Sequence, residues 1–167
     1  MIEENRYRPG WVLLCCCIAV AAAAAAEYRE LEWADLMPQE EMQMWMDLQM
    51  NVDHTGSGPS STVFQSFATI QALDGQKVRL PGFVVPVETT PDGQLSEFFL
   101  VPFFGACIHV PPPPANQIVY ARLAEPIPMV NIWDAFWMEG TLHVEQVSNA
   151  TAQAAYTMDV DRLRRYE

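Results

Sequence analysis

The sequence predicts a mainly β protein: a small OB-like, partly open barrel of five or six strands preceded by one N-terminal helix. Three observations lead to this fold class. Short segments rich in β-branched and aromatic residues follow one another beyond Thr62, separated by turn residues. Two of the longer segments contain Gly82 or Gly140, where a strand can bend and serve both sides of a barrel. One helical pattern precedes them.

Length and charge limit the classes of function. The chain has 167 residues, 50% of them hydrophobic, which suits one packed domain with a short appendage. Its formal net charge is −12, from 21 acidic and 9 basic residues. Binding of phosphate groups needs clustered Lys and Arg, so this charge argues against nucleic acid as a partner. The same charge disfavours an anionic membrane surface.

Residues 1–26 have the pattern of a signal peptide. Arg6 and Arg8 precede an unbroken apolar run from Trp11 to Ala26. This run is short for a spanning helix, which needs about 20 residues, and the alanines before Glu27 suit signal-peptide cleavage. We therefore expect a periplasmic protein that starts near Glu27. In the alternative, the segment stays uncleaved and tethers the chain to the membrane.

The cysteines lie mostly in this first segment. Lipid attachment at Cys15, Cys16 or Cys17 is a further alternative, although the preceding residues do not match the usual attachment motif. If the segment is removed, Cys107 is the only cysteine left, so the mature chain forms no intramolecular disulfide.

Residues 27–53 are predicted to form a lead-in segment and one helix. Asp35 is a suitable capping residue, and Pro38 fits a first helical turn, where its missing N–H costs nothing. Apolar residues then recur at helical spacing between Met42 and Met46, which gives the helix one apolar face.

A linker and a β domain follow. Residues 54–61 are rich in Gly, Ser and Pro and are expected to be flexible, so the β domain covers residues 62–167. Turn signals such as Asp74-Gly75 separate the expected strands. These strands are Val63–Gln71, Gln76–Glu88, Leu95–Phe103, Gln117–Leu123, Phe136–Val147 and Ala155–Val160.

Four segments carry a family resemblance. They read LEWADLMP (31–38), VRLPGFVVPVE (78–88), EFFLVPFFGACIHVPPPPANQIVY (97–120) and WMEGTL (137–142). In this order they resemble an exported bacterial family known as domain of unknown function 3299. The resemblance implies a periplasmic or envelope-associated protein without an established enzymatic activity. Relatives beside ABC-type export or metal-related genes imply an envelope ABC-type transport system as a partner.

Cys107 and His109 are the most distinctive pair of side chains in the sequence. On an extended strand, residues two apart share a face, with Cβ atoms about 6 to 7 Å apart. Both side chains can then reach one ion. The prolines from Pro111 to Pro114 force the chain out of the sheet as a stiff segment. We therefore expect a zinc or copper ion here, because these metals take thiolate and imidazole ligands.

Other residues are candidates to complete this pocket. His143 is a third candidate metal ligand, and Asn116, Gln117 and Glu88 are candidate pocket residues. Their spacing from Cys107 is not diagnostic. In the enzymatic alternative, Cys107 is a nucleophile and His109 or His143 its base. In the structural alternative, Cys107 is a small buried side chain in the core.

The most concrete expectation is an exported periplasmic accessory or binding protein with this metal site. The main alternative is a metal-free adaptor for an envelope ABC-type transporter that holds a protein partner through aromatic side chains. A thiol-dependent enzyme is the third alternative. The aromatic residues in question are Phe98, Phe99, Phe103, Phe104, Trp133, Phe136 and Trp137. The C-terminal segment DRLRRYE, in contrast, is expected to be a solvated helix end or tail.

Overall fold

The computed structural model describes residues 28–50, 66–106 and 113–167. Its helices are η1 (Trp33–Leu36), α1 (Gln39–Met50), η2 (Gln71–Leu73) and η3 (Ala115–Gln117). Its strands are β1 (Arg29–Glu30), β2 (Gln76–Thr89), β3 (Leu95–Val101), β4 (Val119–Ile127), β5 (Ala135–His143), β6 (Val147–Ser148), β7 (Gln153–Ala154) and β8 (Tyr156–Arg165). The predicted signal peptide and the predicted 54–61 linker lie outside the described residues.

Five strands form a barrel. They are hydrogen-bonded in the order β2, β3, β4, β8 and β5, and pairing between β5 and β2 closes the ring. Neighbours are antiparallel except β4 and β8, which run parallel. The short β1 adds a parallel strand beside β2. The predicted mainly β, OB-like barrel is thus confirmed, with its ring closed by the β2–β5 pairing.

The bend in β2 allows one strand to serve two walls. Its residues up to Phe83 pair with β5, and those from Phe83 onward pair with β3. Gly82 lies at this change of partner, where an added Cβ would be 2.7 Å from the main-chain oxygen of Val101. Only glycine permits this approach of two backbones, as its position in the sequence indicated.

Gly140 has the same role in β5. An added Cβ would lie 2.2 Å from the main-chain oxygen of Asp159 on β8. The register between β5 and β8 shifts between Glu139 and Gly140, which is the mark of a bulge. The two glycines that indicated bent strands in the sequence therefore both lie at irregular positions of the barrel.

Several sequence-based expectations need correction. The expected strand Phe136–Val147 ends at His143, and Val147 begins the separate β6. Gln117, expected to start a strand, ends η3, and β4 begins at Val119. The described part of the expected strand Val63–Gln71 is not a strand, and Gln71 begins η2. β3 ends at Val101, two residues before the expected end at Phe103. The last strand, β8, continues to Arg165, so the arginines of DRLRRYE lie in the sheet and not in a helix end or tail. Pairing with β5 overrides the strongly polar composition of this segment.

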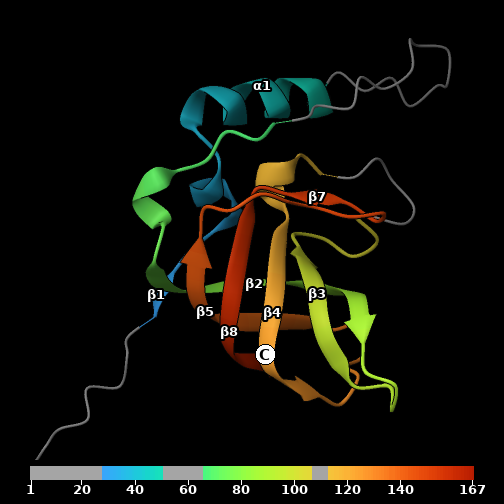
Figure 1. Cartoon of the computed structure of the whole chain (residues 1–167). Helices are drawn as coiled ribbons and strands as arrows, with labels where there is room; N and C mark the ends of the chain where they lie inside the picture. Colours follow the sequence, from blue (N-terminus) through green and yellow to red (C-terminus); the bar gives the residue numbers. More distant parts are fainter. Residues whose placement is uncertain (1–27, 51–65, 107–112) are drawn as a thin grey trace, which may run out of the picture.

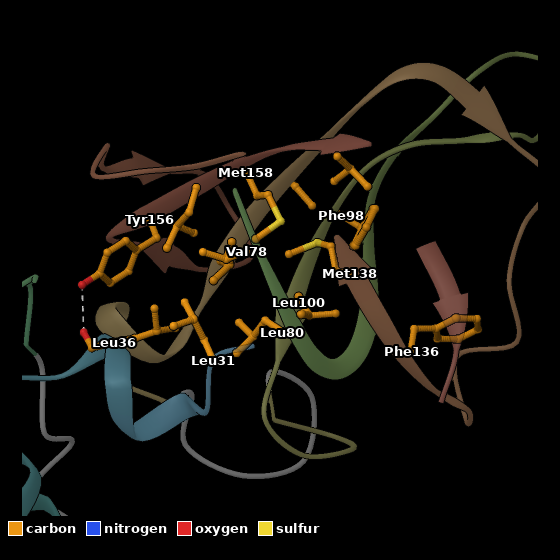
Figure 2. Packing of buried hydrophobic residues seen from close by; sticks show 14 of the residues in the cluster. Leu31, Leu36, Val78, Leu80, Phe98, Leu100, Phe136, Met138, Tyr156 and Met158 are labelled. Carbon is orange, nitrogen blue, oxygen red and sulfur yellow. Dashed lines mark hydrogen bonds between the residues drawn. The ribbon is translucent and has the colours of Figure 1, made fainter. Parts of the chain in front are cut away.

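The main core fills the inside of the barrel. Alternate residues of the strands point inward, among them Val78, Leu80, Phe98, Leu100 and Met138, all of them fully buried (Figure 2). The core reaches beyond the strands, because the hydroxyl of Tyr156 donates to the main-chain oxygen of Leu36 at 2.9 Å (Figure 2). This bond attaches the N-terminal segment to the barrel end.

The N-terminal segment forms the short helix η1 before α1 begins. The carboxylate of Asp35 accepts from the backbone N–H of Glu32 at 2.9 Å, so Asp35 lies inside η1, where it completes the capping box of that turn and does not cap α1 as expected. The main-chain oxygen of Pro38 accepts from the N–H of Met42 at 3.0 Å and begins α1. Figure 1 shows α1 lying across one end of the barrel. No helix of the described residues is long and apolar enough to cross a membrane.

Candidate functional site

Cys107 and His109 lie outside the described residues, between Ala106 and Pro113. Both of these flanking residues are buried. The metal pair therefore stays a prediction, and the candidate residues around it can be placed one by one.

Asn116 and Gln117 lie side by side in η3 and are both buried. The side-chain amide of Asn116 donates to the main-chain oxygen of Ala68 at 2.9 Å and lies 3.2 Å from both Glu41 Oε2 and Ser66 Oγ. The Oδ1 atom of Asn116 has no hydrogen-bond partner in the described part of the chain. Gln117 Nε2 donates to the main-chain oxygen of Trp33 at 2.9 Å.

His143 lies at the end of β5 on the outer side of the barrel and is partly exposed. Its Nε2 atom is 3.2 Å from Asp159 Oδ2, and its Nδ1 atom is 3.9 Å from Asp74 Oδ1. These carboxylates hold the imidazole ring beside β8. His143 and η3 belong to the same end of the barrel, because His143 pairs with Thr157 and Val119, just after η3, pairs with Tyr156.

Glu88 does not lie near His143. It is exposed near the far end of β2, opposite Glu97 on β3, whereas the start of β2 pairs with Leu142 beside His143. The structure thus brings Asn116 and Gln117 together and separates His143 from Glu88. Among the described residues, no three His, Cys, Asp or Glu side chains form a group that could hold a metal ion.

A row of polar contacts crosses the outer surface of β3 and β4. The hydroxyl of Tyr120 donates to Glu97, and burial, followed by this hydrogen bond, raises the pKa of Tyr120 to about 12. The guanidinium of Arg122 lies over the Tyr120 ring and donates to Glu145 Oε2 at 3.1 Å. This bond, with a second from Thr157, lowers the pKa of Glu145. The neutral phenol of Tyr120 therefore lies between the charged side chains of Glu97 and Arg122.

The outer face of β3 and β4 is also covered by the chain itself. OB barrels bind oligonucleotides and oligosaccharides on the corresponding face. Here a second apolar cluster buries it, with β7 lying near the top of the strands (Figure 1). The buried members of this cluster are Phe99, Val101, Ala106, Ile118, Tyr120, Ala152 and Ala154. The usual ligand face of the fold is thus occupied by this chain's own side chains.

The second cluster continues into an exposed apolar region. Partly buried Phe83 and Val85 of β2 pack against it. Beside them, a small hollow opens to solvent. The hollow is lined by Phe83, Val84, Val85, Pro86, Phe104, Gly105 and Ile132. These residues come from β2, the turn after β3 and the loop between β4 and β5, so the fold brings three separate segments together here.

The rings of Phe83 and Phe104 line the hollow, and further exposed aromatic residues follow beside it. Trp133 stacks on Phe104 with ring centroids 4.3 Å apart, and Phe104 meets Phe83 edge to face at 6.1 Å. Trp133 is 69% exposed, and Phe103 and Phe104 are each more than a third exposed. We define the aromatic surface as Phe83, Phe103, Phe104, Ile132 and Trp133. It presents several apolar side chains to solvent side by side.

The family described as "Protein of unknown function (DUF3299)" matches residues 33–165. The chain belongs to the DUF3299 family. The resemblance found in the sequence is therefore confirmed. A DUF3299 family protein from Pseudomonas aeruginosa PAO1, known from its crystal structure, is 37% identical, with a TM-score of 0.68. This similarity covers 84% of the present chain and 97% of the Pseudomonas chain.

Two further comparisons add little to the DUF3299 assignment. A protein from Leishmania major Friedlin described as an aspartyl-tRNA synthetase is 12% identical, with a TM-score of 0.39. That similarity covers 77% of the present chain and 26% of the Leishmania chain. No curated protein matches the sequence.

In this DUF3299 protein, the aromatic residues named from the sequence lie in three places. Phe98, Phe99 and Phe136 are buried and belong to the two apolar clusters. Phe103, Phe104 and Trp133 belong to the aromatic surface, and Trp137 contacts Tyr166 on another wall. Sequence reasoning did not identify Phe83 and Ile132. A signal existed for Ile132, because Ile132 and Trp133 are adjacent apolar residues in a loop.

Proposed function

We propose that the protein is an exported, non-enzymatic accessory protein that binds a protein partner through the aromatic surface. The observation that carries this proposal is the stacked and exposed pair of Trp133 and Phe104. Indole rings are costly to leave in water, and they are frequent anchors at protein interfaces. The N-terminal apolar run supports export to the periplasm.

The arrangement of the rings favours binding over packing. Trp133 contributes to neither apolar cluster, so its ring does not stabilise the core. Phe104 stacks on the Trp133 ring and is itself supported edge to face by Phe83, which reduces the entropy lost when a partner binds. The partner we favour is a component of an envelope ABC-type transport system, the setting that the family resemblance implies.

Site-specific photo-crosslinking tests this function in the exporting cell. A photoreactive amino acid replaces Trp133 in one variant and Phe104 in a second. In a control variant it replaces Met44 of α1, which is 55% exposed and lies on another element. We expect positions 133 and 104 to give the same adduct with one envelope protein. That adduct should be missing from position 44.

The same experiment can contradict the proposal. If all three positions give the same set of adducts, the crosslinks report random encounters and the aromatic surface is not a binding site. If the only adduct is a dimer of the chain, the protein is a self-associating one and the adaptor function is wrong.

A second candidate function is metal binding at Cys107 and His109, with a zinc or copper ion. Two observations favour it. The two residues are spaced so that they can share an ion. In addition, Asn116 Oδ1 is a buried acceptor without a partner in the described residues, nine positions after Cys107. Of the other residues suggested by the sequence, Gln117 adjoins Asn116. His143 and Glu88 would not be needed as ligands of this ion.

Native mass spectrometry of the purified protein tests the metal site. We expect a zinc or copper adduct in the parent chain that is lost in Cys107→Ala and in His109→Ala. His143→Ala is the matched control, since it removes an imidazole on the outer wall of β5. An adduct that survives both cysteine and histidine replacements, or a bare mass in the parent, would show that this pair holds no metal.

A further inference from the structure

Each Lys and Arg of the five barrel strands contacts a carboxylate of the same chain, whereas Arg29 of β1 donates to Gln76. Lys77 pairs with Asp161, Arg79 with Glu30, and Arg122 with Glu145. The C-terminal arginines of β8 pair in the same way. These pairs are Arg162 and Arg164 with Glu139, and Arg165 with Asp134. An acidic partner would therefore have to displace existing ion pairs.

Three carboxylates of the β2–β3 hairpin, whose first strand lines part of the hollow, form no ion pair with the described residues. We call Glu88, Asp92 and Glu97 the acidic rim. All three belong to the hairpin of β2 and β3, and Glu88 follows Pro86 of the hollow by two residues. Asp92 lies in the turn between the strands and is exposed. Glu88 is therefore the member of the rim that follows the hollow along β2.

Glu88 and Glu97 face each other directly across the two strands. Like charges in opposite positions of neighbouring strands repel and destabilise the pairing. The hydroxyl of Tyr120 donates to Glu97, which relieves part of this repulsion, while Glu88 remains exposed. A cation placed between the two carboxylates would relieve the rest. The rim thus has the charge pattern of a surface that meets a basic side chain.

We propose that the aromatic surface and the acidic rim together bind an extended segment of a partner protein in which large apolar residues are followed by Lys or Arg. This inference rests on the proposed function and specifies the partner. The apolar side chains pack on the aromatic surface against Phe104 and Trp133. The basic side chains lie between Glu88 and Glu97. Along β2, the step from Pro86 to Glu88 is about 7 Å, so the basic residue follows the apolar anchor by two or three positions.

Three synthetic peptides test this specificity. They share the same apolar anchors, one of them Trp, and carry two Lys, two Gln or two Glu residues two and three positions further on. Binding to the exported, purified protein is measured by fluorescence anisotropy at low salt. We expect the Lys peptide to bind about three- to tenfold more tightly than the Gln peptide, and the Glu peptide to bind most weakly. The difference should shrink at high salt, because exposed charges are then screened.

Variants separate the two parts of the site. Trp133→Ala should weaken binding of all three peptides. Glu88→Gln should reduce the difference in affinity between the Lys peptide and the Gln peptide. Its matched control is Glu40→Gln, which removes the same charge from an exposed position of α1. This control should leave the affinity difference between the two peptides unchanged.

Two outcomes would overturn the inference. If the three peptides bind equally well and all lose affinity in Trp133→Ala, the partner is apolar and uncharged. The proposed function then stands and this specificity does not. If no peptide binds, or if only self-association of the chain depends on Trp133, a basic and apolar partner segment is ruled out. Crosslinking at position 133 would then decide the proposed function by itself.

Discussion

Asn116 and Glu41 are 75 positions apart in the sequence, yet Asn116 Nδ2 lies 3.2 Å from Glu41 Oε2. The contact joins α1 to η3, next to the start of β4. Ser66 completes the group, because its hydroxyl donates to Glu41 and accepts from the N–H of Ala68 at 3.1 Å. Three segments that are distant in the sequence therefore meet at one buried amide.

Asn116→Ala should destabilise the protein. The variant removes the donor for the main-chain oxygen of Ala68 and leaves Ser66 and Glu41 short of one partner. The expected loss is about 1–3 kcal/mol in the free energy of unfolding, measured by urea denaturation. Gln153→Ala is the control, since Gln153 is exposed and bonds only weakly to Ser148. Equal midpoints for both variants would mean that the buried amide contributes nothing.

Gly140→Ala should disrupt the barrel between β5 and β8. The new methyl group would lie 2.2 Å from the main-chain oxygen of Asp159, so the two strands would have to separate. We expect a loss of about 3 kcal/mol or more, seen as a lower melting temperature or a loss of soluble protein. Thr141→Ala, one position along β5, is the control for a substitution in this strand that adds no methyl group. A Gly140→Ala protein with an unchanged melting temperature would contradict the bulge.

Arg164→Gln should destabilise the protein more than Arg165→Gln. Arg164 donates to Glu139, whose carboxylate is 3% exposed, whereas Arg165 pairs with the more exposed Asp134. Loss of Arg164 leaves a buried charge with only the Arg162 contact at 3.4 Å. We expect a loss of about 1–3 kcal/mol for Arg164→Gln and less than about 1 kcal/mol for Arg165→Gln in urea denaturation.

A second substitution checks the cause. Adding Glu139→Gln to Arg164→Gln should restore part of the lost stability, because no unpaired carboxylate then remains buried. If the double variant is as unstable as the sum of the single variants, the two side chains do not interact.

The stability of the protein should fall as the pH rises from about 10 to about 12. The pKa of Tyr120 is raised to about 12, so the folded state retains a phenol proton that the unfolded state has already lost. This contribution to stability is complete below the unfolded pKa and disappears above the folded one. Tyr120→Phe should flatten this part of the stability profile, as measured by urea denaturation at successive pH values.

The hydrogen bond from Tyr120 can be tested directly. Glu97→Gln should lower the pKa of Tyr120 in a carbon-13 NMR titration of labelled tyrosines, because it removes a charged acceptor. Glu125→Gln removes an exposed carboxylate from β4 and should leave the titration as it was. Identical shifts in both variants would assign the effect to overall charge.

The sequence predicted the barrel because its decisive features are local. Gly82 and Gly140 each interrupt a long apolar segment, and each lies where two backbones approach closely in the structure. The polar C-terminal part of β8 could not be predicted in this way. Its pairing depends on β5, beyond the intervening β6 and β7, and Arg164 is held there by Glu139 of β5, a contact that the local composition does not reveal.

The aromatic surface was only partly predictable, for a similar reason. Composition marks Phe103, Phe104 and Trp133 as aromatic, but so are Phe98 and Phe99, which are buried. Whether a ring lies inside or outside depends on strand alternation and on where β3 ends. The stacking of Trp133 on Phe104 depends on two loops that meet only after the barrel has formed.

The place of β8 in the barrel has a consequence for how the chain folds. This strand is the last in the sequence, yet it lies between β4 and β5 and completes the ring. No earlier set of strands can close without it, and Tyr156 at its start also contacts Leu36, 120 positions away. Contacts between such distant positions make folding slow. A polypeptide emerging during synthesis therefore keeps its apolar strands exposed until β8 is available, and must be protected from aggregation until then.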